Sequence, residues 1–248
     1  MVRDVIPYAL GALLLGILGF VTGDFALQWQ PVPAGVPLRV PLAYLSAAVL
    51  VAGGSAVLWR KTLRVGALVL GLFYGICWVV LLQLPRVLAH LSDVSVWLGF
   101  GESLTHACGG LVAWAMYDTD ASRRRLVVRV LRVAFGACLL IFGLSHFVYA
   151  QFTATMIPSW LPAPFFWVYL TGSGHLAGGV SMISGVLTRL AATLVAAMLA
   201  CFVVLLHLPR VLAAPTSRVE WTMLGVATSL TGAAWIIRTA IARQVTES

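Results

Sequence analysis

The protein has 248 residues, of which 61% are hydrophobic and 10% are charged, and its formal net charge is +8. Soluble globular domains are about 45–50% apolar and about 25% charged, so this composition excludes a soluble domain. A helix needs about 20 mostly apolar residues to cross a bilayer, and such runs fill nearly the whole chain. The sequence therefore predicts an integral membrane protein in contact with lipid.

Hydropathy and helix breakers predict an all-α fold with eight transmembrane helices. Stretches rich in proline at 31–37 and 158–164, and three arginines at 123–125, separate apolar runs from one another. The predicted helices span residues 6–27, 42–59, 63–84, 94–117, 128–152, 165–186, 187–208 and 219–241.

One stretch of the chain occurs twice. VVLLQLPRVLA at residues 79–89 returns as VVLLHLPRVLA at residues 203–213, and the single difference places His207 where the first copy has Gln83. This identity predicts a tandem duplication, with a first four-helix repeat at 1–120 and a second at 121–248. Because four is an even number, the two units would run in the same direction through the membrane, as parallel repeats.

Lysine and arginine are divided unevenly between the two ends of the predicted helices. If the N-terminus is placed inside, twelve lie in inner segments and four in outer segments, the four being Arg39, Arg86, Arg210 and Arg218. The positive-inside rule then predicts that both termini are cytoplasmic. The net charge is a consequence of topology and not of nucleic-acid binding, since the basic residues lie at helix ends and form no continuous soluble face.

The polar residues within the predicted helices are also one-sided. Ionisable groups in a membrane are costly, and by default they face the bundle interior or a cavity. The candidates all map to the outer half of the membrane: Asp24, Gln83, Arg86, Glu102, His106, His146, His175, His207 and Arg210. Their clustering predicts a functional site near the outer face.

Two short motifs suggest particular chemistry. Glu102 and His106 are spaced i, i+4 and share a helix face, so the carboxylate is expected to orient the imidazole for proton relay or ligand binding. His207 and Arg210 share a face around Pro209, which removes a backbone hydrogen bond and bends or ends the helix. We expect the imidazole, an unpaired guanidinium and a freed carbonyl to converge there.

Each residue also has a purely structural interpretation. The two arginines that follow prolines would equally serve as interfacial anchors. Glu102 and His106 would satisfy one another for packing alone, and His175, which is flanked by glycines, would make a structural hydrogen bond at a close helix crossing. His146 and His207 favour the functional interpretation, because each belongs to a feature that only the second copy has.

The second half carries a recognisable series of motifs. It reads GLSHF at 143–147, MIPSWLP at 156–162, FWVYLTG at 166–172, AGG at 177–179, TR at 188–189 and HLP at 207–209. Over residues 128–241 these motifs resemble the DoxX family of four-helix membrane proteins. The resemblance implies a four-helix bundle per unit and membrane redox chemistry, similar to the small membrane subunit of thiosulfate:quinone oxidoreductase and to partners of thiol and superoxide-defence enzymes. We accordingly expect a location in the bacterial inner membrane.

Carried over residue by residue, the resemblance implies that His146, Tyr169, His175 and His207 line the site. Two departures matter: family members commonly have an acidic residue in place of His175, and the first copy lacks the histidines at the positions of His146 and His207. Either the ligand differs from the family's or the first copy is mainly structural.

The leading hypothesis is a membrane subunit of a redox system, in effect a quinone-linked oxidoreductase subunit, that binds a quinone or related cofactor near the outer face. A quinone carbonyl needs a donor that supplies a proton, which His146, His175 or His207 would be, and Arg210 would stabilise the developing anion. Glu102 and His106 would carry protons from the outer side. The remaining expected cofactor-binding residues are Asp24, Gln83, Arg86 and Tyr169. A soluble or membrane redox partner is then required, because no soluble domain supplies electrons.

Three alternatives stay open at this point. Two histidines on facing helices are the usual arrangement for haem. Parallel repeats with proline-broken helices suit transport of a small solute. An anchor or assembly protein would need no chemistry at all. The sequence predicts no metal site, and it leaves a homo-oligomer open.

Overall fold

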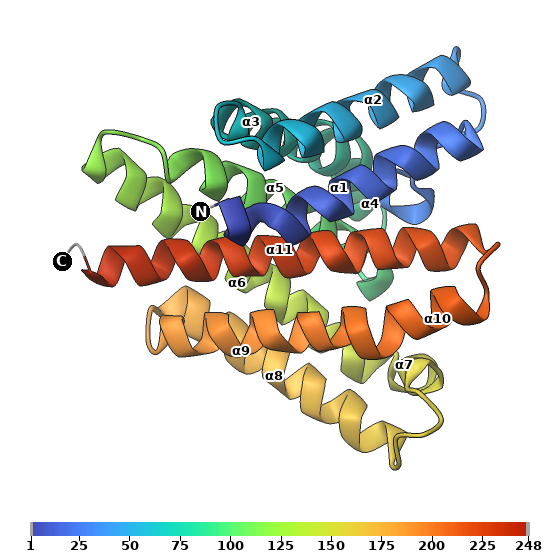
Figure 1. Ribbon diagram of the computed structural model, residues 1–248. Helices are drawn as coiled ribbons and strands as arrows, with labels where there is room; N and C mark the ends of the chain where they lie inside the picture. Colours follow the sequence, from blue (N-terminus) through green and yellow to red (C-terminus); the bar gives the residue numbers. More distant parts are fainter. Residues whose placement is uncertain (1, 247–248) are drawn as a thin grey trace.

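The computed structural model describes residues 2–246, in which helices and loops account for all the backbone and no strand occurs. Eight long helical segments run between the two ends of the bundle (Figure 1). They are α1 (Val2–Thr22), α2 (Arg39–Leu58), α3 to α4 (Leu63–Ala89), α5 (Val94–Ala115), α6 (Ala121–Val148), α8 (Pro164–Ser184), α9 to α10 (Thr188–Ala213) and α11 (Arg218–Thr246).

Six of these segments are long and apolar enough to cross a membrane. The other two, α5 and α8, have 22 and 21 residues, which is sufficient length. Both are rich in glycine, serine, threonine and histidine, so their mean hydropathy is lower. The prediction of an all-α, multi-pass membrane protein is confirmed, while eight spans arranged as two repeats stay a prediction.

The first helix is shorter than the sequence indicated. It was expected to reach residue 27 but ends at Thr22, because Gly23 takes a φ of +60°, a left-handed conformation that stops the helix. Asp24 is therefore a loop residue and not a group within the first helix. A short 3₁₀ turn, η1 (Leu27–Trp29), follows it.

The Leu-Pro-Arg stretches do not end their helices. In each copy a π-helical segment, η2 (Phe73–Gln83) or η3 (Phe202–His207), comes directly before the proline, and the helix continues as α4 (Leu84–Ala89) or α10 (Leu208–Ala213). Leu208 N–H donates to Val203 O, five residues back. In a π-helix each carbonyl accepts from the N–H group five residues later instead of four. The helix can therefore continue although proline has no N–H to donate. Such π segments occur frequently at functional sites.

Helices of the two halves of the chain pack directly against each other. α1 packs between α2 and α11, and α6 packs between α8 and α5. Thus the first long helix of each half lies against the last helix of the other half. Helices α5 and α11 also contact each other, and one continuous hydrophobic core runs through residues of both halves. The division expected at residue 120 falls in the loop between α5 and α6, but packing crosses it extensively.

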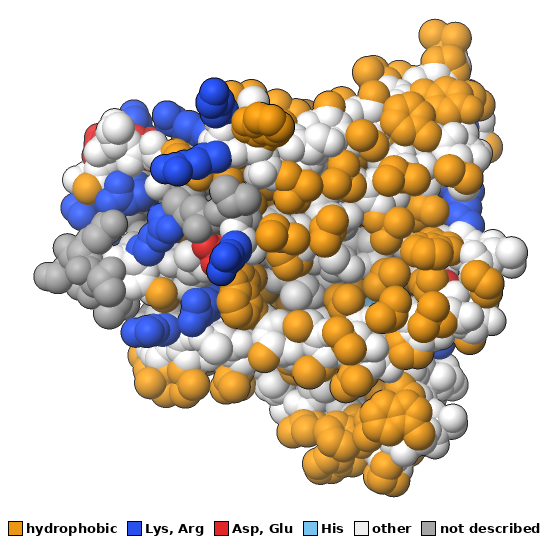
Figure 2. Space-filling view, viewed as in Figure 1, with side chains coloured by type: hydrophobic (Ala, Val, Ile, Leu, Met, Phe, Trp, Pro, Cys, Tyr) orange, Lys and Arg blue, Asp and Glu red, His pale blue; other side chains and the backbone are white. Residues whose placement is uncertain are grey.

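Charge separates the two ends of this bundle. Lysine and arginine gather at one end, where α1 begins and α11 ends, and on the face shown in Figure 2 many hydrophobic side chains are exposed along the rest of the bundle. We call the first the basic end and the other the opposite end. Asp120 caps the start of α6 at the basic end by accepting from the N–H groups of Ser122 and Arg123.

Candidate ligand site

Helices α6 and α8 bring two histidines together. The ring centroids of His146 and His175 lie 5.2 Å apart. The two helices can approach this closely because glycines face the contact: a Cβ on Gly172 would lie 2.8 Å from His146 Cβ, and one on Gly143 would lie 2.6 Å from Leu176 Cγ. The glycine-rich stretch that the sequence suggested as a packing surface is therefore what positions the pair.

The ring nitrogens of the pair are only partly used. His146 Nδ1 lies 2.8 Å from Phe142 O, and since a carbonyl only accepts, Nδ1 donates and Nε2 keeps a free lone pair. His175 is 2% exposed, and its Nδ1 has no hydrogen-bond partner among the described residues. A buried polar nitrogen without a partner is uncommon, so this pair has hydrogen-bonding capacity to offer a ligand.

Phe202 covers the pair. Its ring centroid lies 6.4 Å from that of His146 and 6.2 Å from that of His175. Phe202 is the first residue of η3, which follows α9 and belongs to a third helical segment. Phe202 was not among the residues predicted for the site, although it comes directly before the repeated stretch at 203–213.

Among the described residues, neither Tyr169 nor His207 makes a ring contact with the histidine pair. Tyr169 is 44% exposed and stacks on Phe147 and Phe165, with centroids 5.6 and 6.3 Å apart. The Tyr169 ring therefore contacts aromatic neighbours on the surface of α6 and α8 and not the histidine pair. His207 is buried at the end of η3, and its Nδ1 has no hydrogen-bond partner among the described residues.

Arg210 is not the unpaired cation that was expected. Its Nε and Nη2 donate to the two carboxylate oxygens of Glu220 at 2.9 and 2.7 Å, a bidentate ion pair between α10 and α11. His207 lies within electrostatic range of both charges. Sequence spacing does not indicate Glu220 as the partner, because it is ten residues away and lies on the next helix.

The expected pairing of the Glu102 carboxylate with the His106 imidazole is also wrong. Glu102 Oε2 accepts from Trp29 Nε1 at 2.6 Å. His106 Nδ1 lies 2.6 Å from the backbone oxygen of Glu102, and the imidazole packs against Tyr74 and Trp78. The two side chains share a helix face but reach to different neighbours, and the Glu102 carboxylate secures the η1 turn.

Gln83 and Arg86 hold the same turn from the other side. Gln83 is fully buried, and its Nε2 donates to Gln28 O and Trp29 O at 3.0 and 3.2 Å. Arg86 Nη1 donates to Gln83 Oε1 at 3.3 Å. Where the second copy has His207 with an unused nitrogen, the first copy thus has an amide that is saturated by hydrogen bonds.

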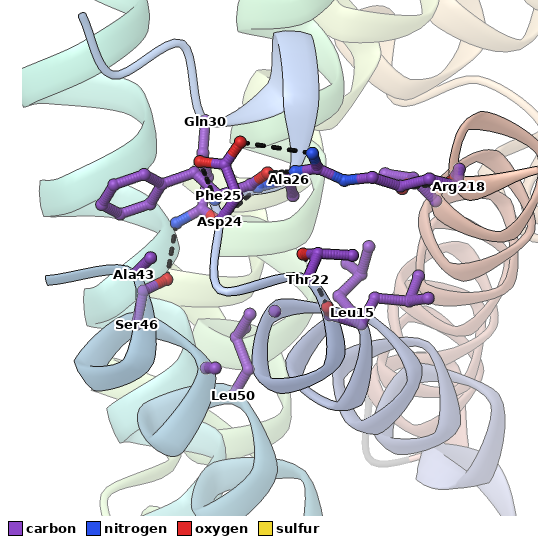
Figure 3. A pocket seen from close by; sticks show the side chains of 14 residues that line it. Leu15, Thr22, Asp24, Phe25, Ala26, Gln30, Ala43, Ser46, Leu50 and Arg218 are labelled. Carbon is purple, nitrogen blue, oxygen red and sulfur yellow. Dashed lines mark hydrogen bonds and ion pairs between the residues drawn. The ribbon is translucent and has the colours of Figure 1, made fainter. Parts of the chain in front are cut away.

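Asp24 anchors an ion-pair cluster at the opposite end (Figure 3). Its carboxylate pairs with Arg39 of α2 and, at 3.2 Å, with Arg218 of α11, whose Nη2 also donates to Phe25 O at 2.5 Å. Burial raises the Asp24 pKa, but hydrogen bonds from Phe25 N–H and the two arginines outweigh it, so the pKa is lowered overall. Beside the cluster, Gln30 Nε2 donates to Ser46 Oγ at 2.7 Å.

A small cavity lies next to this cluster, between α1, α2 and α11. Its volume is about 10 Å³, which is room for about one water molecule. Thr22, which the predicted duplication aligns with His146, is among the lining residues. This cavity is too small for a cofactor. The ion pairs of Asp24 therefore mainly hold the loop at 23–38 against α11.

A comparison with known protein families shows which part of the chain resembles one of them. Residues 127–208 match the DoxX family model. This segment is similar to the DoxX membrane domain. It contains α7 (Ala150–Met156), α8, α9 and η3 with nearly all of α6, and hence the histidine pair and Phe202. The resemblance inferred from the motifs is confirmed over this range. No curated protein and no solved structure shows significant similarity to the chain.

The DoxX-like segment therefore includes His146, Tyr169, His175 and His207 and excludes the other candidates. Of these four, the structure joins His146 and His175 and covers them with Phe202. Asp24, Gln83, Arg86, Glu102 and His106 make their hydrogen bonds and ion pairs with residues other than this pair. No group of three or more histidine, cysteine or acidic side chains suited to a metal ion occurs in the described part of the chain.

Proposed function

We propose that the protein is the membrane subunit of a redox system and that His146 and His175 bind the head group of a quinone or a related lipophilic carrier. The observation that carries this proposal is the unused hydrogen-bonding capacity of the two imidazoles within the DoxX-like domain. A quinone head group is a flat ring with carbonyl oxygens, which require donors. In the Nδ1–H tautomer, buried His175 supplies such a donor.

The aromatic cover supports the same ligand class. The Phe202 ring lies beside both imidazoles, so a ligand bound against the pair would also contact this ring. A planar aromatic head group can take the place of that ring at little cost in apolar contact. A proton supplied by an imidazole would then accompany reduction of the bound carbonyl, with the electrons coming from a separate redox partner.

Haem suits the pair less well. Two imidazoles that share one iron must lie on opposite faces of a flat macrocycle. The rings of His146 and His175 are instead tilted by 50° and lie 5.2 Å apart, in near contact, and no macrocycle fits between them. The haem alternative would require α6 and α8 to move apart.

The topology we propose places the site toward the outer side of the bacterial inner membrane. All eight long helices would cross, as two parallel repeats, with the basic end in the cytoplasm because of the positive-inside rule. His146 lies near the end of α6 that is remote from the basic end. A carrier dissolved in the membrane would reach the pair from the lipid along α6 and α8.

Binding of a short-chain ubiquinone to the purified protein in detergent tests the proposal. Loss of a hydrogen bond to a buried carbonyl costs about 1–3 kcal/mol, so His175→Leu, which removes the donor, should weaken binding about tenfold. His146→Ala removes the ring that lies beside that donor and should also weaken binding. His90→Leu provides the matched control, because His90 is exposed in the loop after α4. Unchanged affinity in both site variants, or equal losses in all three, would exclude this site as the place of binding.

A further inference from the structure

The first half contains a second group of buried polar atoms that the proposed site does not use. His106 of α5 and Tyr74 and Trp78 of η2 are all 0% exposed. Their rings form a mutual cluster: the centroids are 4.8 Å apart for Tyr74 and His106, 5.8 Å for Trp78 and His106, and 4.8 Å for Tyr74 and Trp78.

Each of these three side chains has one polar atom with no hydrogen-bond partner among the described residues. The atoms are His106 Nε2, the Tyr74 hydroxyl and Trp78 Nε1. Most buried polar atoms in proteins are paired with protein groups or with ordered water. Three unpaired atoms on three rings in contact therefore indicate one common partner, rather than three separate exceptions.

The hydrogen-bonding roles of these atoms define that partner. His106 Nδ1 lies 2.6 Å from the Glu102 carbonyl oxygen and must donate to it, which leaves Nε2 as an acceptor. Trp78 Nε1 can only donate, and the Tyr74 hydroxyl can do both. The partner must therefore donate to His106 and accept from Trp78, and it must fit among packed rings. Water satisfies all three conditions, and buried waters typically make about three hydrogen bonds.

A fourth group lies beside the cluster. Ser229 of α11 is 0% exposed and its hydroxyl is unpaired, and it lies close to the Tyr74 hydroxyl without forming a well-aligned hydrogen bond. The site thus stands where η2 and α5 of the first half meet α11 of the second. At the matching positions of the repeat, Tyr74 corresponds to Met198 and Trp78 to Phe202, which cannot make these bonds.

We propose that His106, Tyr74 and Trp78 bind one internal water molecule, which links the π-helical segment η2 to α5. The three side chains that bind this water occur in the first copy alone, so the first copy is more than a diverged duplicate of the DoxX-like domain. The water places an exchangeable proton in the middle of the bundle, against the free nitrogen of His106. The inference does not depend on quinone binding in the other half.

Water-edited nitrogen-15 NMR of the full chain in lipid bilayers, with labelled histidine, tests the proposal directly. The His106 Nε2 resonance, identified by its loss in His106→Gln, should receive magnetisation from water, and Tyr74→Phe should reduce the transfer at least twofold. His90 in the exposed loop serves as the internal positive control. Transfer to His90 with none to His106 would overturn the proposal.

Thermal unfolding provides a test that does not depend on resonance assignment. If the cluster is dry, Tyr74→Phe removes an unpaired buried hydroxyl and should raise the unfolding temperature. If a water is bound, the variant loses one of its hydrogen bonds and the temperature should fall. Tyr44→Phe is the matched control, because Tyr44 is 42% exposed on α2, and it should change little. A rise for Tyr74→Phe alone would refute the water site.

Discussion

Substitution of Gly172 by alanine should push the two histidines of the candidate site apart. A Cβ at this position would lie 2.8 Å from His146 Cβ and 3.1 Å from Phe147 Cε2. Carbon atoms pack at about 3.5–4.0 Å, so α6 and α8 must separate by roughly 1 Å. The nearest obstacle, His146 Cβ, cannot swing away, because it is attached directly to the α6 backbone.

The magnitude follows from a comparison with Gly174 in the same helix. There a Cβ would meet Met198 Sδ at 3.3 Å and Met198 Cε at 3.8 Å, and a methionine side chain adapts easily. Both variants gain the same helix propensity, up to about 1 kcal/mol, so their difference isolates the clash. Overpacking costs about 1–3 kcal/mol, and Gly172→Ala should be less stable than Gly174→Ala by that amount.

Reversible unfolding in mixed micelles measures the stability difference, and short-chain ubiquinone binding measures its effect on the site. Since separation of α6 and α8 moves the His175 donor away from a head group that lies against His146, we expect Gly172→Ala to bind about tenfold more weakly, the loss of about one hydrogen bond. Gly174→Ala should bind as wild type does. Equal stability and equal affinity in the two alanine variants would refute the role assigned to the α6–α8 contact.

Three further predictions concern other parts of the structure. Phe202→Ala uncovers the imidazoles and should accelerate association of the quinone in stopped-flow measurements; an unchanged rate would show that Phe202 is no barrier. Arg210 and Glu220 form a partly exposed pair, so a double-mutant cycle with Arg210→Gln and Glu220→Gln should give a coupling of about 0.5–1 kcal/mol in unfolding experiments, and additive effects would contradict the pairing. Arg123 lowers the Asp118 pKa from 3.8 to about 2; the ionised carboxylate therefore stabilises the fold above pH 3.8, and this contribution should fade as the pH falls toward 2. Asp118→Asn should remove that part of the pH dependence of unfolding, and an identical profile would exclude it.

The repeated stretch shows where local sequence rules reach their limit. Proline within Leu-Pro-Arg predicted a helix end, because proline lacks the N–H that the preceding turn requires. Both helices continue instead, since a π-helical turn before the proline changes which donors meet which carbonyls. That adjustment depends on the packing of a whole helix against its neighbours, which the identity of the residues around Pro85 and Pro209 does not reveal.

Charge pairing shows the same limit. The i, i+4 spacing correctly placed Glu102 and His106 on one face of α5, but Glu102 reaches Trp29 and His106 uses a backbone oxygen. Arg210 likewise finds Glu220 on α11. The spacing of residues along one helix indicates which side chains share a face. Their hydrogen-bond and ion-pair partners depend on which helices pack against that face.

The sequence by itself determined the membrane character, the positions of the helices and the DoxX-like half, because each depends on properties that are local to a segment: apolar length, breakers and short motifs. Only the tertiary structure decided that His146 meets His175 under Phe202, that the ion pairs of Asp24 and Arg210 cross between helices, and that the two halves interlock through α1 and α11. The physical reason is that these contacts join residues far apart in the chain. Their geometry is set by how closely glycine-lined helices approach and how each helix is rotated, and no single segment encodes either quantity.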